Sequence, residues 1–295
     1  MIQSHLKHFQ LGNVNLLSGE ELPDAVLAYR TYGKLSPEKD NVVLLPTFFT
    51  GNHIRNEGFF GTGRAIDPVR YFVISVNLFG NGVSTSPSNA SAPVNGHNFP
   101  HISLYDNVFC QHRLLTEKFG IKKIRLVTGW SMAGCQAFQW AAQFPKMVEA
   151  ILPFCASART SLHNFVFLEG VKAALTADQN WKDGRYDTPP ETGLKAFGRV
   201  YAGWAFSQTF FREELFRTLG FETVEDFLQD WEKDHLKWDA NNLLVKLKTW
   251  QTADISANPL YRGNFQCALS AILAKTIIIS SSSDLYFPPE DNKIE

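Results

Sequence analysis

The sequence has no excess of charge of either sign. Its 295 residues include 28 Lys and Arg against 29 Asp and Glu, a formal net charge of -1. No basic block stands out, so we expect neither nucleic acid nor an anionic membrane surface as a partner. No apolar run approaches the roughly 18 residues that span a bilayer, and the first residues do not resemble a secretory signal. We therefore expect a cytoplasmic location.

Cysteine is scarce, and phosphate-binding glycine loops are missing. The cysteines lack C-x-x-C spacing, and three of them lie in apolar or helical contexts, which favours buried thiols in a reducing compartment over disulfides or zinc ligands. The sequence contains no G-K-[ST] loop, and the glycines at 61 and 63 lack a third at the right spacing. We expect no cofactor and no metal. The four cysteines are Cys110, Cys135, Cys155 and Cys267.

The sequence does contain the pattern of a layered α/β core. Apolar residues make up 44% of the chain, and residues 5–33 alternate apolar and polar positions, which predicts antiparallel strands. Short continuous apolar runs suit parallel strands buried on both faces. Helical spacing predicts helices over 103–120 and 132–144. This alternation predicts a doubly wound, mostly parallel sheet. The runs are 42–45, 71–76, 124–127 and 275–280.

Residues 158–262 differ from the rest of the chain. They are rich in Trp and Phe, carry helical patterns and show no clear buried strand. Because a strand resumes at 275, we interpret them as a helical lid inserted into an α/β core formed by 1–157 and 263–295. A second helical domain unrelated to any site is the alternative.

A serine stands where a strand passes into a helix. Residues 127–140 read VTGWSMAGCQAFQW, with Ser131 between the strand and the helix. This order is typical of a nucleophile elbow, usually G-x-S-x-G, in which small residues let a strained turn close. Ala133 replaces the last glycine here. The alternative is a serine that only caps the helix.

Two further segments fall where such a fold needs them. PTFFTGNH (46–53) follows the first parallel strand, where Phe49 would offer a backbone N–H to an oxyanion. Asp284 follows an apolar strand at its carboxyl end, where open α/β sheets build sites. An ordinary βα loop and a turn aspartate are the respective alternatives.

Several segments in order resemble homoserine O-acetyltransferase-like α/β-hydrolases. GWSMAGCQAFQWA is similar to the family's GGSMGGMQALEWA, and the resemblance extends over nearly the whole chain through RAIDPVRYFVISVNLFGNGVSTSPSN, FPHISLYDN, the 227–256 segment and KTIIISSSSDLYFPPEDN. NLFGNGVSTSPSN and DLYFPPEDN resemble a fungal subgroup, some of whose members resemble hydrolases of secondary-metabolite and host-selective-toxin biosynthesis. That analogy would allow a peroxisomal location.

The resemblance implies an α/β-hydrolase fold with a helical lid and acyl-enzyme chemistry on an ester or an acyl-CoA. Ser131 would be the nucleophile, Asp284 the acid, and the N–H groups of Phe49 and Met132 the oxyanion hole. The reaction would be the hydrolysis of an ester by water, or the transfer of an acyl group to an acceptor such as homoserine. Arg212, with Arg199 as an alternative, is the candidate for binding an acceptor.

The family's catalytic histidine lies after the acid, whereas no histidine follows Asp284 here. His53, just past the Phe49 loop, is the histidine most able to reach the mouth of the site. This departure predicts a C-terminally truncated relative that lacks the last strand and helix, with an exposed sheet edge that a second copy would cover. It also keeps open a catalytically impaired relative that binds a ligand or a partner.

Overall fold

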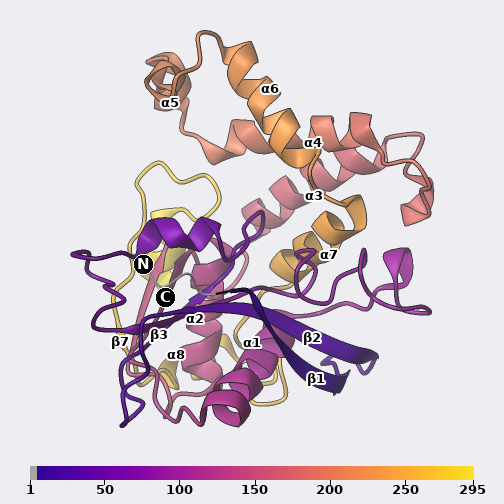
Figure 1. Cartoon of the computed structure of the whole chain (residues 1–295). Coiled ribbons are helices and arrows are strands. Elements are labelled where there is room, and N and C mark those ends of the chain that lie inside the picture. The colour runs from indigo at the N-terminus through magenta and orange to yellow at the C-terminus, as the bar shows by residue number, and fades with distance from the viewer. Residues whose placement is uncertain (1–4) are drawn as a thin grey trace.

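A twisted sheet forms the centre of the molecule in the computed structural model, which describes residues 5–295. Its strand order is β1-β2-β4-β3-β5-β6-β7. β1 and β2 form an antiparallel hairpin, β2 pairs antiparallel with β4, and the remaining pairs are parallel (Figure 1). The strands are β1 Lys7–Asn15, β2 Glu21–Tyr32, β3 Val42–Pro46, β4 Phe72–Val76, β5 Leu126–Trp130, β6 Ala150–Phe154 and β7 Lys275–Thr276. The doubly wound α/β fold predicted from the sequence is confirmed.

Two buried helices cover one face of this sheet. α1 (Leu104–Arg113) begins at Ser103, whose hydroxyl accepts from the N–H of Asp106 while the Asp106 carboxylate accepts from Ser103, a capping box. The helix continues as one π turn, η3 (Leu114–Lys118). α2 (Met132–Gln143) is buried along its whole length. Both helices match the predicted ones to within a few residues.

The stretch between β6 and β7 is built from helices. Aromatic side chains of α3, α4 and α7 belong to one buried cluster, which includes the fully buried Trp250, and aromatic side chains from α4 to α6 form a second cluster. The helices α5 and α6 stand farther from the sheet than α7 (Figure 1). An isolated bridge between Arg159 and Asp254 brings the beginning of this stretch beside the residues that follow α7. Its helices are α3 Leu162–Thr176, α4 Glu191–Ala205, α5 Gln208–Arg212, α6 Val224–His235, α7 Ala240–Gln251 and α8 Phe265–Ser270. Short helices elsewhere are η1 Arg55–Phe59, η2 Gly96–Asn98 and α9 Pro289–Ile294. Two more, η4 Lys182–Gly184 and η5 Leu215–Leu219, lie between α3 and α4 and between α5 and α6.

Three local features differ from the sequence predictions. β6 was missed, because its sequence AILPF is short and contains Pro153, which normally argues against a strand inside a sheet. The predicted strand 275–280 has only two ladder residues, followed by a bridge from Ile279 to Phe154. Cys267 on α8 is exposed rather than buried.

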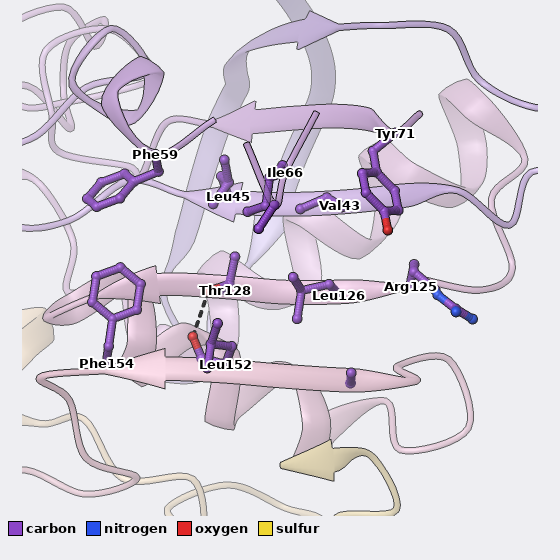
Figure 2. A pocket seen from close by; sticks show the side chains of 12 residues that line it. Val43, Leu45, Phe59, Ile66, Tyr71, Arg125, Leu126, Thr128, Leu152 and Phe154 are labelled. Atoms are coloured by element: carbon purple, nitrogen blue, oxygen red, sulfur yellow. Dashed lines mark hydrogen bonds between the residues drawn. The ribbon is translucent and has the colours of Figure 1, made fainter. Parts of the chain in front are cut away.

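The side of the sheet opposite α2 is open toward β7. Thr128 pairs with Leu152, and the register of β6 with β7 sets Leu152 beside Ile277. Residues paired in this way share one face, so the face continues to Ile277 and Ile279, which are 65% and 50% exposed. Side chains of β3, β5 and β6 line an apolar groove of about 420 Å³ there (Figure 2). This end of the sheet therefore carries exposed apolar side chains.

No helix within residues 5–295 has both the length and the apolar character required to cross a bilayer.

Candidate active site

The turn between β5 and α2 has the strained geometry of an elbow. Ser131 has φ 54° and ψ -134°, a backbone conformation that residues other than glycine rarely adopt. Its N–H donates to the carbonyl of Phe154 at the end of β6 (3.1 Å), and its carbonyl accepts from Cys135 (3.1 Å). The hydroxyl makes no capping bond to α2, so Ser131 does not serve the structural role that a capping serine would.

Small residues around the elbow let the strand and the helix meet. A Cβ added to Gly129 would lie 2.5 Å from the Cβ of Ala133, and one added to Gly134 would lie 2.5 Å from the Cβ of Ala156. Both distances are far inside van der Waals contact. Gly129 and Gly134 therefore cannot carry side chains without displacing the turn, and Ala133 occupies the space that a second glycine would leave empty.

The first turn of α2 and the loop after β3 supply backbone donors. The N–H of Met132 lies in the first helical turn, where no intrahelical acceptor exists. Phe49 is buried after β3, and no acceptor within residues 5–295 engages its N–H. Its ring packs against Phe197, Tyr201 and Trp250 at centroid distances of 6.2, 5.8 and 5.6 Å.

Asp284 lies in the turn after β7. Its Oδ1 accepts from the N–H groups of Tyr286 (2.8 Å) and Phe287 (2.9 Å). The residue therefore does perform the turn role considered as its alternative. Both donors to one oxygen also fix the orientation of the carboxylate, which is the arrangement that an orienting acid requires.

The end of β6 connects the serine to the acid. Phe154 accepts from Ser131, and the next N–H, of Cys155, donates to the carbonyl of Ile279 (2.8 Å). Burial, and secondarily the charge of Asp284 nearby, raises the pKa of the Cys155 thiol to about 11. Ser131 and Asp284 thus lie on the two sides of one strand end, although no hydrogen bond joins them.

Within residues 5–295, no hydrogen bond connects a histidine ring to Asp284 or to the Ser131 hydroxyl. His53 is buried, and its Nδ1 and N–H both contact the Asn77 side chain (3.3 and 3.1 Å). Burial lowers the pKa of the His53 ring, so the ring is neutral at pH 7. Its surroundings are those of a structural histidine that supports the loop after Phe49.

The structure does not bring Arg212 to the serine. Arg212 is exposed at the end of α5, the helix that stands farthest from the sheet (Figure 1). Arg199, the alternative, is bound by Glu225 and Glu232. Arg212 is therefore too far from Ser131, and Arg199 is already occupied by two carboxylates, so neither guanidinium binds a carboxylate beside the serine.

One unusual neighbour of the Phe49 loop is not predicted from the sequence. Lys246 on α7 is fully buried, and its ammonium donates to the carbonyl of Phe49. Helical periodicity places this position on the inner face of α7, but nothing in the sequence distinguishes it from a surface lysine.

The sheet order, the elbow and the loop after β3 define an α/β-hydrolase. A family model described as the alpha/beta hydrolase fold matches residues 40–295. The chain belongs to the α/β-hydrolase family.

Relatives within this family are esterases and acetyltransferases. The chain is 34% identical to a probable esterase of Corynebacterium glutamicum, over 98% of this chain and 84% of that protein. It is 35% identical to an ethyl acetate hydrolase of Pseudomonas veronii (96% and 82% covered) and 32% identical to a homoserine O-acetyltransferase of Chlorobaculum tepidum (93% and 80%). These relatives support ester hydrolysis or acyl transfer as the class of reaction.

Solved structures agree with this assignment. The acetyl esterase MekB superposes with a TM-score of 0.96 at 34% identity, covering 99% of this chain and 85% of that one. A homoserine O-acetyltransferase from Bacillus anthracis gives a TM-score of 0.85 at 25% identity, covering 100% and 87%.

Proposed function

We propose that this protein is a serine esterase that hydrolyses small acyl esters through an acyl-enzyme on Ser131. The observation that carries the proposal is Ser131 itself, which has a positive φ at a strand-to-helix turn and a hydroxyl that caps nothing. Enzymes hold nucleophiles in such strained turns to expose the attacking oxygen. The esterase relatives named above support the same chemistry.

In the proposed reaction, Ser131 Oγ attacks the ester carbonyl and its proton passes to a base. The carbonyl oxygen becomes an oxyanion, which the N–H groups of Phe49 and Met132 would bind. The alcohol leaves with a proton, and water then releases the acid from the acyl-serine. Asp284 would orient or charge-stabilise the group that accepts the serine proton.

The base determines how fast this chain works. Loss of a triad base costs up to about 10⁶-fold in turnover in known serine hydrolases, and about 10³- to 10⁴-fold over water persists from the remaining groups. Reaction with a fluorophosphonate probe needs only the attack by Ser131 and no release of an acyl group by water, so labelling is the better assay.

Labelling with a fluorophosphonate tests the proposal. We expect one adduct per chain on Ser131, none in Ser131→Ala, and full labelling in Ser207→Ala, a matched serine at the start of α5 whose hydroxyl does cap its helix. Equal labelling of Ser131→Ala, or none in the parent chain, contradicts the esterase proposal. The second outcome would favour the ligand- or partner-binding alternative.

Acyl transfer to homoserine is the second candidate, supported by the acetyltransferase relatives. Hydrolysis is favoured because Arg199 is held by two glutamates and Arg212 is exposed on α5. Acetyl-CoA with and without homoserine separates the two: O-acetylhomoserine formed in a Ser131-dependent manner would favour transfer. A role in secondary metabolism and a peroxisomal location stay predictions from the resemblance, since the relatives named above are bacterial.

A further inference from the structure

A lysine buried without a carboxylate lies behind the Phe49 loop. Lys246 is 0% exposed, and the ion pairs formed by residues 5–295 do not include it. Lysine is almost never fully buried unless it is paired, because an ammonium loses its hydration there. Burial, with a smaller contribution from the charge of Arg55, holds its pKa well below the usual range. Burying this side chain costs folding free energy, which other interactions of the lysine must offset.

The contacts of Lys246 are specific. Its Nζ donates to the carbonyl of Phe49 and lies 3.7 Å from the centre of the Trp238 ring. A cation above a tryptophan face is attracted to it, most strongly where water is excluded. These two contacts fix the amine in one place, against a backbone carbonyl of the loop.

The carbonyls of this loop are held from behind. The carbonyl of Thr47 accepts from the amide of Gln136 on α2 (2.9 Å), and the carbonyl of Phe49 accepts from Lys246. The N–H of Phe49, by contrast, meets no acceptor among residues 5–295. The N–H of Phe49 shares its peptide plane with the carbonyl of Phe48, which accepts from the N–H of Gly51 (3.0 Å). Anchoring the Phe49 carbonyl on the other side of the Cα limits rotation about the φ and ψ angles of Phe49, and so helps to hold that N–H in one direction.

We infer that Lys246 is a positioning residue, which holds the Phe49 carbonyl so that the Phe49 N–H points at the oxyanion. This inference rests on the proposed function. It also assigns α7 a task beyond packing against α3, because α7 then sets the geometry of the loop. An ion pair between Arg55 and Asp234 on α6 (2.7 Å) ties the segment after the loop to the same helical region.

The Phe49 carbonyl can be observed alone. Phe49–Thr50 is the only Phe–Thr pair in the sequence, so a chain labelled with ¹³C-carbonyl Phe and ¹⁵N-Thr gives a single carbonyl–amide correlation. In Lys246→Met, loss of the ammonium donor should move this carbonyl resonance upfield. In Lys248→Met, a control two residues along at an exposed position of α7, it should stay in place.

The rate of labelling reports on the oxyanion donor. We expect the second-order rate of fluorophosphonate labelling to fall about 10- to 100-fold in Lys246→Met, somewhat less than the loss of a whole oxyanion donor. Lys248→Met should react like the parent. The unfolding free energy of Lys246→Met should be equal or higher, because an apolar side chain replaces a buried unpaired amine. If Lys246→Met does not fold, Lys246→Gln, which keeps an N–H donor, takes its place and should lie between parent and Met.

The outcomes separate this inference from the function beneath it. A parent chain that is not labelled overturns the proposed esterase and the role of Lys246 together. A labelled parent with an equally fast Lys246→Met overturns the positioning role alone. So does a Phe49 carbonyl resonance that does not move. A slower rate that merely follows a lower stability would mark Lys246 as a packing residue.

Discussion

The two halves of the candidate site are built very differently. Around Ser131, β3 and α2 are buried throughout, and β5 lies inside the sheet with its middle residues buried and Trp130 exposed at its end. Added Cβ atoms at Gly129 and Gly134 would overlap neighbouring side chains. Asp284 follows a two-residue strand at the sheet edge, beside isoleucines that are half or more exposed. The difference shows that the serine side is held by packing and the acid side by local hydrogen bonds. Substitutions should therefore affect the two sides in different ways.

The largest expected effect is on the serine side. Gly134→Val should lower the unfolding free energy by about 3 kcal/mol, because its Cβ would overlap Ala156 and the surrounding buried atoms cannot move to make room. The matched control is Gly203→Ala on α4, where an added Cβ meets nothing within 4 Å; it should stabilise by up to about 1 kcal/mol. Urea denaturation measures both, and a harmless Gly134→Val would show that the elbow is not tightly packed.

The stability of the turn at Asp284 should change little when the charge of Asp284 is removed, but it should fall when the oxygen that accepts its hydrogen bonds is removed. Asp284→Ala removes the oxygen that receives two N–H groups and should cost about 1 to 2 kcal/mol. Asp284→Asn keeps that oxygen and should cost much less. Thermal unfolding of the two variants gives the comparison; equal losses would mean that the charge, rather than the turn, stabilises this side.

The alkylation of Cys155 should report the charge of Asp284. Because burial and then Asp284 raise the pKa of this thiol to about 11, little thiolate exists at pH 8 and reaction with iodoacetamide is slow. Asp284→Asn should lower that pKa and raise the rate by roughly two- to tenfold, since one pKa unit is a factor of ten in thiolate. Cys267, exposed on α8, is the internal control and should react quickly in both chains. Mass spectrometry of the two cysteine-containing peptides measures both rates. An unchanged rate at Cys155 would mean that the charge of Asp284 does not act on this thiol.

The smallest effect on stability is expected at the edge. Ile277→Thr with Ile279→Thr should change the unfolding free energy by only about 0.5 kcal/mol, because both side chains are already largely exposed. Self-association should nevertheless fall, since an open apolar edge invites pairing. Light scattering against concentration tests this; unchanged association would mean that the edge does not mediate it.

The sequence predicted the elements whose signals are local. Capping at Ser103 and the strand–serine–helix order each depend on neighbouring residues, and the structure has both. The sequence did not predict β6, whose short apolar run contains Pro153. It also did not predict the exposure of Cys267, which lies on the outer face of α8. Lys246 could not be found, because its meaning depends on a carbonyl 197 residues away in the chain.

The candidate site residues also divide into those that a local pattern predicts and those that it does not. Ser131, Met132 and Phe49 follow from one fold rule, that sites form at the carboxyl ends of parallel strands. A role for Arg212 depended instead on the resemblance, which implies an arginine in the helical stretch without fixing its position, and α5 places Arg212 away from the sheet. Long-range placement of a side chain on an inserted helix needs tertiary packing that no local pattern encodes.

The contact between Gly129 and Ala133 has a consequence for protein engineering. The two positions share room for one methyl group, so they should behave as a single exchangeable unit. Gly129→Ala alone should fail, whereas Gly129→Ala combined with Ala133→Gly should recover much of the lost stability. A library that varies the two positions independently would discard the viable combination, and one that varies them as a pair would retain it.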